Sequence, residues 1–213
     1  MKSAAELRAD FDRIALASDP DAHGPHEAAL LARLPGGGRA LDAGCGTGAV
    51  ARRLAARYEH VDAVDLSPEM IRIARASSAH SNIDYYLADL RDWLPREPRY
   101  DCITSMAVLH HFDARAIVPR LAAALRPGGT LLVVDVTHRP GLFNLPVNAA
   151  AWLLQRFRRT SRELRAAFHA HGSGETYLTP RQARALYAEL LPGAIVRAHF
   201  FWRYSVWWIS TPA

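Results

Sequence analysis

The sequence predicts a doubly wound α/β domain with a mostly parallel sheet, and three observations support this prediction. Short apolar runs of strand length alternate with amphipathic helical segments as far as Val136. A glycine-rich turn from Gly44 to Gly48 directly follows the first of these runs. The segment Thr130 to Val136 is a nearly unbroken apolar run, which indicates a strand buried on both faces. Strands and helices at this spacing favour right-handed crossover connections.

Length and composition predict one domain. The chain has 213 residues, of which 50% are hydrophobic, enough for a substantial core. We expect a single domain, residues 1–213, made of a helical cap (1–38), a central core (39–136), a helical insertion (137–177) and a terminal helix with a strand pair (178–213). No apolar run approaches the roughly 20 residues that span a bilayer, and the N-terminus lacks a signal-peptide pattern. These features predict a cytoplasmic protein without a membrane span.

The spacing of apolar residues and the positions of turn-forming residues predict the helices and strands in order. Leu7, Phe11 and Ile14 recur at helical spacing in the segment from Ala4, and the Asp19 to Pro25 turn separates it from a second helical segment, Ala28 to Leu34. Strands are expected at 39–43, 60–65, 83–88, 100–105 and 130–136. A helix with Val50, Leu54 and Tyr58 on one face follows the glycine turn.

Helix ends carry recognisable signals. Ser67-Pro68-Glu69 reads as an N-cap, a proline at the first helical position and an acid that suits the helix dipole. Asp113 caps another helix, which Pro119 should kink and which Arg126-Pro127-Gly128-Gly129 should end. Thr179 to Gln182 is a capping box before a helix that reaches Leu191. The strands 194–200 and 203–210 are so closely linked that they must be antiparallel.

The insertion breaks the α/β alternation. Residues 137–177 are expected to hold helices at about 146–158 and 161–171 and a Gly172-Ser173-Gly174 hinge. Aromatic and arginine residues lie side by side there, and we predict a lid that shapes the acceptor pocket. The alternatives are a basic amphipathic surface helix and a partly exposed helix packed over the edge of the sheet. His169 and His171 are two apart on a helix and do not share a face, so we expect no metal site.

The net charge and the two cysteines bear on three possible features: a nucleic-acid site, a disulfide and a zinc site. The net charge is +5, and Lys2 is the only lysine among 26 basic residues. Spread along the chain, this charge fits a solvated basic surface better than a polyanion site, although a nucleic-acid partner stays open. Cys45 and Cys102 fall in predicted core elements, so we expect buried free thiols rather than a disulfide or a zinc site.

Two ligand classes compete for the glycine turn. Gly44, Gly46 and Ala49 satisfy the dinucleotide pattern G-x-G-x-x-A. Asp42 argues against that assignment, because a carboxylate just before the turn would repel a pyrophosphate. S-adenosylmethionine carries an ammonium and a sulfonium and no phosphate. Asp65, at the end of the next strand, can accept hydrogen bonds from both ribose hydroxyls of either ligand.

Five successive motifs resemble those of class I S-adenosylmethionine-dependent methyltransferases. In order, they are Leu41 to Gly48, Val64 to Met70, Ala88-Asp89-Leu90, Tyr100 to Ile103 with Val108 to Phe112, and Leu125 to Gly129. The resemblance covers about residues 1–136. It implies a seven-stranded sheet in the order 3-2-1-4-5-7-6 with strand 7 antiparallel, S-adenosylmethionine as cofactor and S-adenosylhomocysteine as product.

The resemblance also implies roles for individual residues. The turn with Gly44, Cys45, Gly46 and Gly48 would lie under the cofactor, and Asp42 would face its aminoacyl portion. The other implied contacts are Asp65 on the ribose, Leu66 and Met70 beside the adenine, Asp89 on the adenine amino group, Leu90 through its backbone amide, and Met106 on the methionyl side.

The acceptor chemistry remains open. His110 and His111 follow the strand nearest the methyl group and could serve as a general base for a hydroxyl acceptor, or they could be structural. A small-molecule acceptor is the leading hypothesis, with methyl transfer to its O or N atom. The alternatives are methylation of a nucleic acid and a cofactor-binding protein without catalytic activity. The sequence makes no prediction of oligomeric state.

Overall fold

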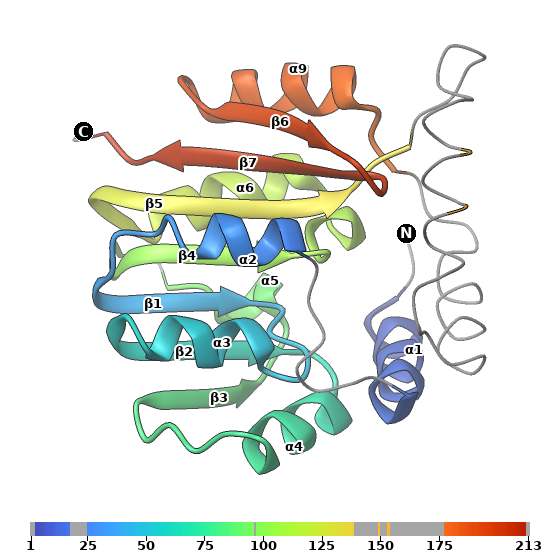
Figure 1. The fold of residues 1–213 in the computed structure, drawn as a ribbon, viewed down its shortest axis with the longest axis vertical. Coiled ribbons are helices and arrows are strands. Elements are labelled where there is room, and N and C mark those ends of the chain that lie inside the picture. Colours follow the sequence, from blue (N-terminus) through green and yellow to red (C-terminus); the bar gives the residue numbers. More distant parts are fainter. Residues whose placement is uncertain are drawn as a thin grey trace.

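Seven strands form one sheet in the order β3-β2-β1-β4-β5-β7-β6 (Figure 1). The computed structural model describes residues 3–17, 25–95, 97–138, 149, 153 and 177–211. The strands are β1 (Gly37–Ala43), β2 (Tyr58–Asp65), β3 (Ile83–Leu87), β4 (Tyr100–Met106), β5 (Leu125–Val136), β6 (Ile195–His199) and β7 (Arg203–Ile209). Neighbouring strands from β3 to β5 are parallel, and β7 is antiparallel to both β5 and β6. The predicted order and the reversed seventh strand are therefore confirmed.

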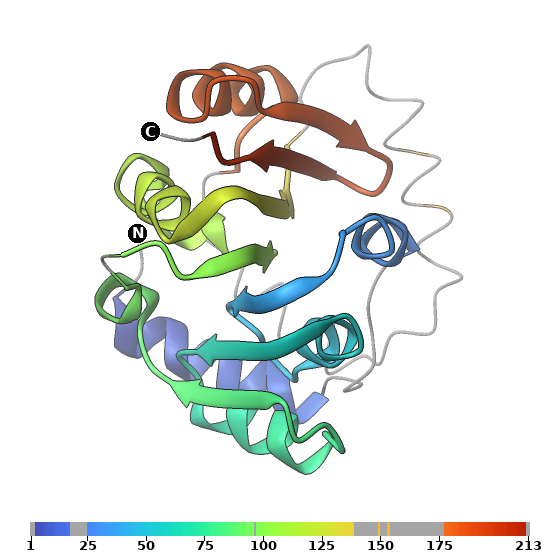
Figure 2. The same cartoon turned by 90° about the vertical axis from the view of Figure 1, so that its left-hand side faces the viewer.

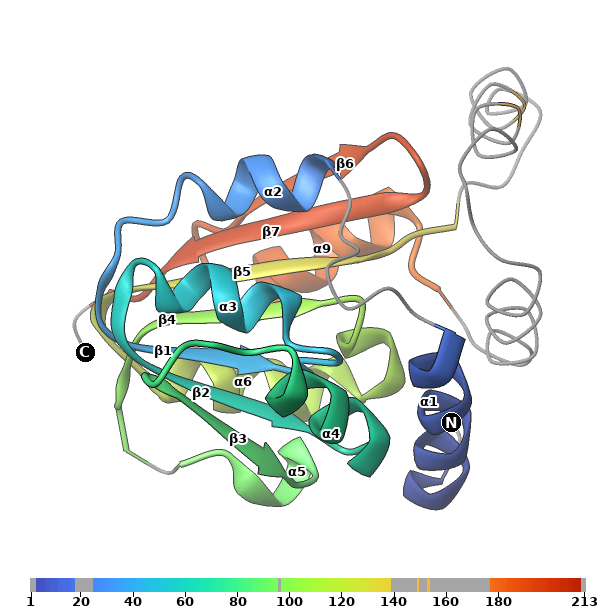
Figure 3. The same ribbon diagram turned by 60° about the horizontal axis from the view of Figure 1, so that its bottom comes forward.

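Helices cover both faces of the sheet. They are α1 (Ala4–Ala17), α2 (Pro25–Leu31), α3 (Ala49–Ala55), α4 (Pro68–Ala76), α5 (Leu90–Trp93), α6 (Ala114–Ala123) and α9 (Pro180–Leu190), with a short 3-10 helix η1 (Leu109–His111). Figures 2 and 3 show α2 and α3 on one face and α6 and α9 on the other. Helix α1 lies beyond the arrowheads of the parallel strands and packs against α4. The sheet thus separates two apolar clusters, one on each face.

The helix caps form as the local sequence predicts. Ser67 accepts a hydrogen bond from the Met70 amide at the start of α4, and Asp113 accepts one from the Arg115 amide at the start of α6. Thr179 and Gln182 form the complete capping box of α9. Each cap needs only residues within one turn of the chain, so it can be identified before the fold is known.

Two segment predictions differ from the structure, and two others are not tested by it. Tyr58 begins β2 instead of extending α3, because α3 ends at Ala55. Residues 125–129 belong to β5 rather than to the end of α6. Leu125 pairs with Tyr100 at the start of β4, and a register shift follows before the regular pairing of β4 with β5 resumes at Cys102. Helix α6 runs through Pro119 from Ala114 to Ala123. The predicted helices and hinge of the insertion, at 146–158, 161–171 and 172–174, lie outside the described residues apart from positions 149 and 153.

A partly buried ion pair, with a fully buried carboxylate, joins three strands toward the amino ends of the sheet. The Arg39 guanidinium on β1 binds both oxygens of Asp62 on β2, at 2.8 and 2.9 Å, and the Tyr100 hydroxyl on β4 donates to Asp62 at 2.8 Å. Burial disfavours the Asp62 charge, yet these hydrogen bonds hold the pKa of its carboxyl below the usual value. The network stabilises a charge that the core would otherwise exclude.

Tyr100→Phe is expected to lower the free energy of unfolding by about 1 to 3 kcal/mol, because the charged carboxylate loses one buried donor. Chemical denaturation would measure the change. Tyr86→Phe is the matched control, since the Tyr86 hydroxyl makes only a long 3.5 Å contact with Asp84 at the surface. Equal effects of the two substitutions would contradict the importance of the buried hydrogen bond.

Within the described residues, no helix is long and apolar enough to cross a membrane.

Candidate cofactor site

A cavity of about 360 Å³ lies at the carboxyl ends of β1 to β4. Its volume is in the range of small-molecule and cofactor sites. The carboxyl ends of parallel strands meet at one edge of the sheet, so residues distant in sequence converge there. Nearly all of the predicted cofactor residues line this cavity, namely Asp42, Gly44, Cys45, Gly46, Asp65, Leu66, Met70, Asp89, Leu90 and Met106.

The glycine turn forms the floor of the cavity. Gly44, Gly46 and Gly48 all have positive φ, the backbone region that glycine adopts without strain. The amides of Gly44 and Cys45 both donate to the Val64 carbonyl at 2.9 Å, which ties the turn to the end of β2. Gly48 is not among the residues that line the cavity: a Cβ there would lie 2.9 Å from the Tyr85 hydroxyl. Gly48 therefore allows the close packing of α3 against β3.

Asp42 is a buried carboxylate at the edge of the cavity. Its side chain accepts a hydrogen bond from Thr104 at 3.0 Å through Oδ1, while Oδ2 has no partner among the described residues. Burial raises the pKa of Asp42 to about 7. A buried acidic oxygen without a donor is suited to a ligand that brings a cationic donor. The residues present therefore fit the ammonium group of S-adenosylmethionine and disfavour a phosphate.

Asp65 organises the turn from the neighbouring strand. Its carboxylate accepts hydrogen bonds from the amides of Gly46 at 2.8 Å and Ser67 at 2.9 Å. Burial nevertheless raises the pKa of Asp65 above the usual value, against the effect of these backbone donors. The side chain lines the cavity with its oxygens already oriented by the backbone, which suits the paired hydroxyls of a ribose.

Asp89 lines the cavity, and its carboxylate also has an ionic partner within the protein. Its carboxylate caps α5 and pairs with the Arg91 guanidinium, whose Nε lies 3.0 Å from both carboxylate oxygens. Burial opposes its charge, yet the hydrogen bonds from Arg91 lower the pKa of Asp89. Both residues line the cavity, so an adenine amino group at Asp89 would share this carboxylate with Arg91. Arg91, which lies in α5 two positions after Asp89, was not predicted as a site residue.

The two histidines occupy different positions. His111 lines the cavity and contacts the Phe11 ring edge-on, with centroids 5.3 Å apart. The His110 ring lies beside the His111 ring, with centroids 3.9 Å apart and planes tilted by 50°. His110 borders a second cavity, of about 260 Å³, on the α6 and α9 side. The histidine pair thus stands between the two cavities.

The sequence did not predict several other residues of the wall. Leu7, Phe11 and Ile14 were expected only as the apolar stripe of a cap helix, and they close the cavity from α1. Glu27 near the N-terminus and Arg203 on β7 also line it, with a carboxylate oxygen and Nε 3.8 Å apart. These contacts join distant parts of the chain, so no local pattern identifies them.

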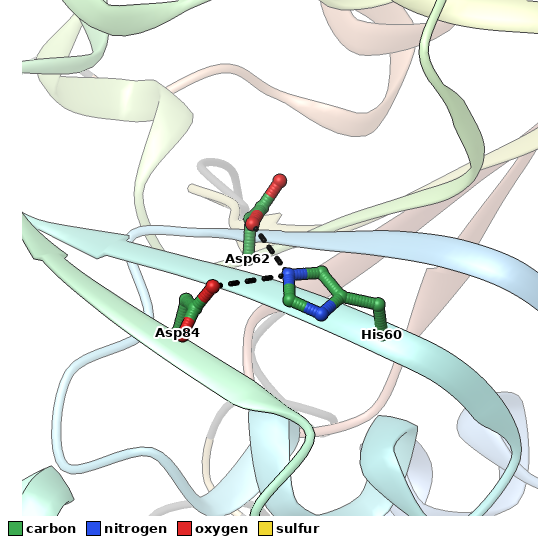
Figure 4. A group of neighbouring side chains, drawn as sticks. All are labelled: His60, Asp62 and Asp84. Carbon is green, nitrogen blue, oxygen red and sulfur yellow. Dashed lines mark hydrogen bonds and ion pairs between the residues drawn. The ribbon is translucent and has the colours of Figure 1, made fainter.

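One group of possible metal ligands lies away from the cavity. The ligand atoms of His60, Asp62 and Asp84 lie within 4.8 Å of one another on β2 and β3 (Figure 4). The His60 Nε2 is 3.1 Å from Asp62 and 3.3 Å from Asp84. Both oxygens of Asp62 already accept hydrogen bonds from the Arg39 guanidinium. The positive charge of Arg39 therefore neutralises this carboxylate in the place that a metal ion would take.

Both cysteines are buried free thiols, as predicted. Burial raises the pKa of the Cys102 thiol to about 12 and that of Cys45 well above its usual value. The reactive thiolate form is therefore disfavoured at both positions.

Comparisons with known proteins give the same classification as the site. Residues 40–129 match the family model described as a methyltransferase domain. The ubiquinone biosynthesis O-methyltransferase of Xylella fastidiosa is 38% identical over 123 residues, which cover 56% of this chain and 50% of that protein. This chain spans about half the length of the curated relatives it matches.

Two solved structures share the fold over nearly the whole chain. The DhpI–SAH complex has a TM-score of 0.66 at 24% identity and covers 98% of this chain and 97% of its own. A methyltransferase solved in complex with the Haloferax volcanii Trm112 activator has a TM-score of 0.70 at 18% identity, with 95% and 98% covered. Fold, glycine turn and family match define residues 40–129 as a methyltransferase domain. The strand order and this match agree with the resemblance to class I S-adenosylmethionine-dependent methyltransferases.

Proposed function

We propose that this protein transfers a methyl group from S-adenosylmethionine to an O or N atom of a small-molecule acceptor and releases S-adenosylhomocysteine. The observation that carries the proposal is Asp42, a buried carboxylate with an unpartnered oxygen beside the glycine turn. An ammonium group satisfies that oxygen, whereas a dinucleotide would bring phosphates toward it. The curated relatives are named as O-methyltransferases, which supports a hydroxyl acceptor.

The residues that line the cavity would hold the cofactor in three parts. Asp42 and the Gly44 to Gly46 turn would bind the aminoacyl portion, and Asp65 would bind the ribose hydroxyls. Leu66, Met70 and Leu90 would enclose the adenine, with Asp89 near its amino group. Met106 would border the sulfonium side. All of these residues except Asp42, Asp65 and Asp89 supply apolar surface or backbone, so the pocket binds by shape as much as by charge.

Methyl transfer from a sulfonium depends more on how the protein positions the acceptor than on acid–base catalysis. When bound, the cofactor supplies a methyl group on a sulfonium with a neutral leaving group. The protein has to hold the acceptor atom in line with that methyl group and exclude water from the site. Phe11 and Ile14 of α1 cover the cavity and supply apolar surface for that exclusion.

Calorimetry with S-adenosylmethionine, S-adenosylhomocysteine and NAD tests the cofactor assignment. We expect binding of the first two and none of NAD. Incubation with methyl-labelled S-adenosylmethionine and a panel of small phenols and amines then separates an enzyme from a protein that only binds the cofactor. Binding of NAD alone would overturn the proposal.

Cofactor affinity is expected to depend on pH through Asp42. Its pKa of about 7 means that the carboxyl is mostly protonated and neutral below that pH. Because the ammonium is attracted by the charged form, affinity for S-adenosylhomocysteine should rise with pH, by about tenfold per unit below the pKa, and level off above it. Asp42→Asn should bind more weakly with a flat profile between about pH 5 and 7. An unchanged slope in this variant would assign the pH dependence to another group.

A further inference from the structure

An arginine from the antiparallel strand β7 reaches the wall of the cofactor cavity. Arg203 is the first residue of β7 and pairs with Val136, the last residue of β5. Because β7 runs against the parallel strands, its start lies beside the arrowhead of β5 in Figure 1, at the edge of the sheet that holds the cavity. The Arg203 side chain is 33% exposed and lines the cavity there. The reversed strand thus brings a cation to the cofactor cavity.

Arg203 has only a loose ionic partner among the described residues. Its Nε lies 3.8 Å from a Glu27 carboxylate oxygen, which is beyond hydrogen-bond distance. Within the described part of the chain, the guanidinium makes no hydrogen bond. Arg91, the other described arginine of the wall, instead donates to both oxygens of Asp89. The planar N–H groups of Arg203 are therefore available for a carboxylate of a ligand, through two parallel hydrogen bonds.

The turn before Arg203 has an unfavourable backbone conformation. Phe201 and Trp202 have φ of +61° and +53°, a region that bulky residues adopt only with strain. The Trp202 carbonyl accepts a hydrogen bond from the Thr137 amide at 2.9 Å, which ties the turn to the end of β5. The tied turn holds the start of β7, and Arg203 with it, at a defined position beside the cavity.

The order of the strands assigns the Arg203 end of the cavity to the acceptor. In the proposed binding mode, Asp65 on β2 binds the ribose, Asp42 on β1 binds the aminoacyl portion, and Met106 on β4 borders the sulfonium. Beyond β4 the sheet continues with β5 and β7. A group bound by Arg203 therefore lies past the sulfonium, on the side away from the adenine and ribose. The acceptor atom has to approach the methyl group from outside the cofactor, so this end of the cavity is open to the acceptor.

We propose that the acceptor carries a carboxylate and that Arg203 binds this group, so that the atom to be methylated points to the cofactor. The inference rests on the methyl transfer proposed above and adds the charge class of the acceptor. Val108 and Phe112 supply apolar surface in the same wall, which suits an aromatic or other apolar body between the acid and the hydroxyl. Glu27 offsets part of the Arg203 charge but is too distant to occupy its donors.

Matched acceptors that differ only in charge test this proposal. The probes are salicylate, protocatechuate and mandelate, each compared with its own carboxamide, in turnover and in calorimetric binding to the S-adenosylhomocysteine complex. For the wild type we expect at least one acid to exceed its amide by about tenfold or more in kcat/KM and in affinity, because the amide cannot form the paired charged hydrogen bonds. If no acid were preferred over its amide in either measurement, the inference would be wrong.

Substitution of Arg203 locates the preference. Arg203→Gln should lower kcat/KM for the preferred acid to that of its amide, through KM, while the affinity for S-adenosylhomocysteine changes less than about twofold. Arg203→Lys should retain part of the preference, because it keeps the charge without the paired donors. Arg197→Gln is the matched control: it removes the same charge from an exposed position on β6 that does not line the cavity, and it should retain the preference.

Three outcomes of these measurements would overturn the assignment of Arg203. They are an unchanged preference in Arg203→Gln, an equal loss in Arg197→Gln, which would make it an effect of net charge, and a loss of S-adenosylhomocysteine affinity of about tenfold or more in Arg203→Gln. The last result would place Arg203 on the carboxylate of the cofactor. Wild-type protein that fails to bind S-adenosylhomocysteine would refute the methyl transfer itself, whereas normal binding without a preference for acids refutes only the acidic acceptor.

Discussion

Gly44→Ala is expected to destabilise the protein by about 3 to 5 kcal/mol and to abolish cofactor binding. Two costs combine at this position. Gly44 has φ +79°, a region that alanine adopts only with strain, and an added Cβ would lie 2.3 Å from one Val108 methyl and 2.7 Å from the other. Val108 lies just beyond the end of β4, so relieving the clash would separate the glycine turn from the neighbouring strand end.

Gly128→Ala separates the two costs. Gly128 has nearly the same φ, +80°, but an added Cβ would meet nothing within 4 Å. This control should therefore lose only the strain energy, about 1 to 2 kcal/mol. Thermal and chemical unfolding give the two values, and calorimetry gives the affinity. Val108→Ala should recover part of the Gly44→Ala loss in a double-mutant cycle. If both glycine variants lost the same stability, the clash between the added Cβ and Val108 would not contribute to the destabilisation.

Asp65→Ala is expected to weaken cofactor binding by about 100-fold or more while the protein remains folded. Two hydrogen bonds from ribose hydroxyls to a charged acceptor are together worth about 3 kcal/mol or more. The substitution also releases the amides of Gly46 and Ser67, which the carboxylate holds at 2.8 and 2.9 Å. The turn would then have to be ordered at the expense of binding energy.

Calorimetry with S-adenosylhomocysteine measures this loss. Asp65→Asn should retain part of the affinity, because one amide oxygen can still accept. Asp84→Ala is the control on the adjacent strand, where the exposed carboxylate is remote from the cavity wall. Affinity within about threefold of the wild type in Asp65→Ala would exclude this residue from the ribose site.

Much of the fold could be predicted because its signals are local. The caps at Ser67, Asp113 and Thr179 each depend on hydrogen bonds within one turn. The glycine turn requires backbone conformations that few residues other than glycine adopt, so its location is visible in the sequence. Alternating strands and helices then leave few topologies, and the motif resemblance supplied the strand order.

The boundary errors have an equally physical origin. Tyr58 fits the apolar face of α3 at helical spacing, but pairing with Gly37 places it in β2. Leu125 continues the apolar face of α6, but pairing with Tyr100 places it in β5. A short apolar segment satisfies both periodicities, and the neighbouring strand decides between them.

The amino-acid order thus specified the class of fold, the turn at the cofactor cavity and the acids at the ends of the first strands, because each depends on residues close together in the chain. Three-dimensional folding decided which distant side chains meet. It placed Asp135 against His110, 25 positions away, Tyr100 against Asp62, 38 positions away, and α1 over the cavity. Such pairs depend on strand register and helix packing, which cannot be predicted from the spacing of residues in a short segment.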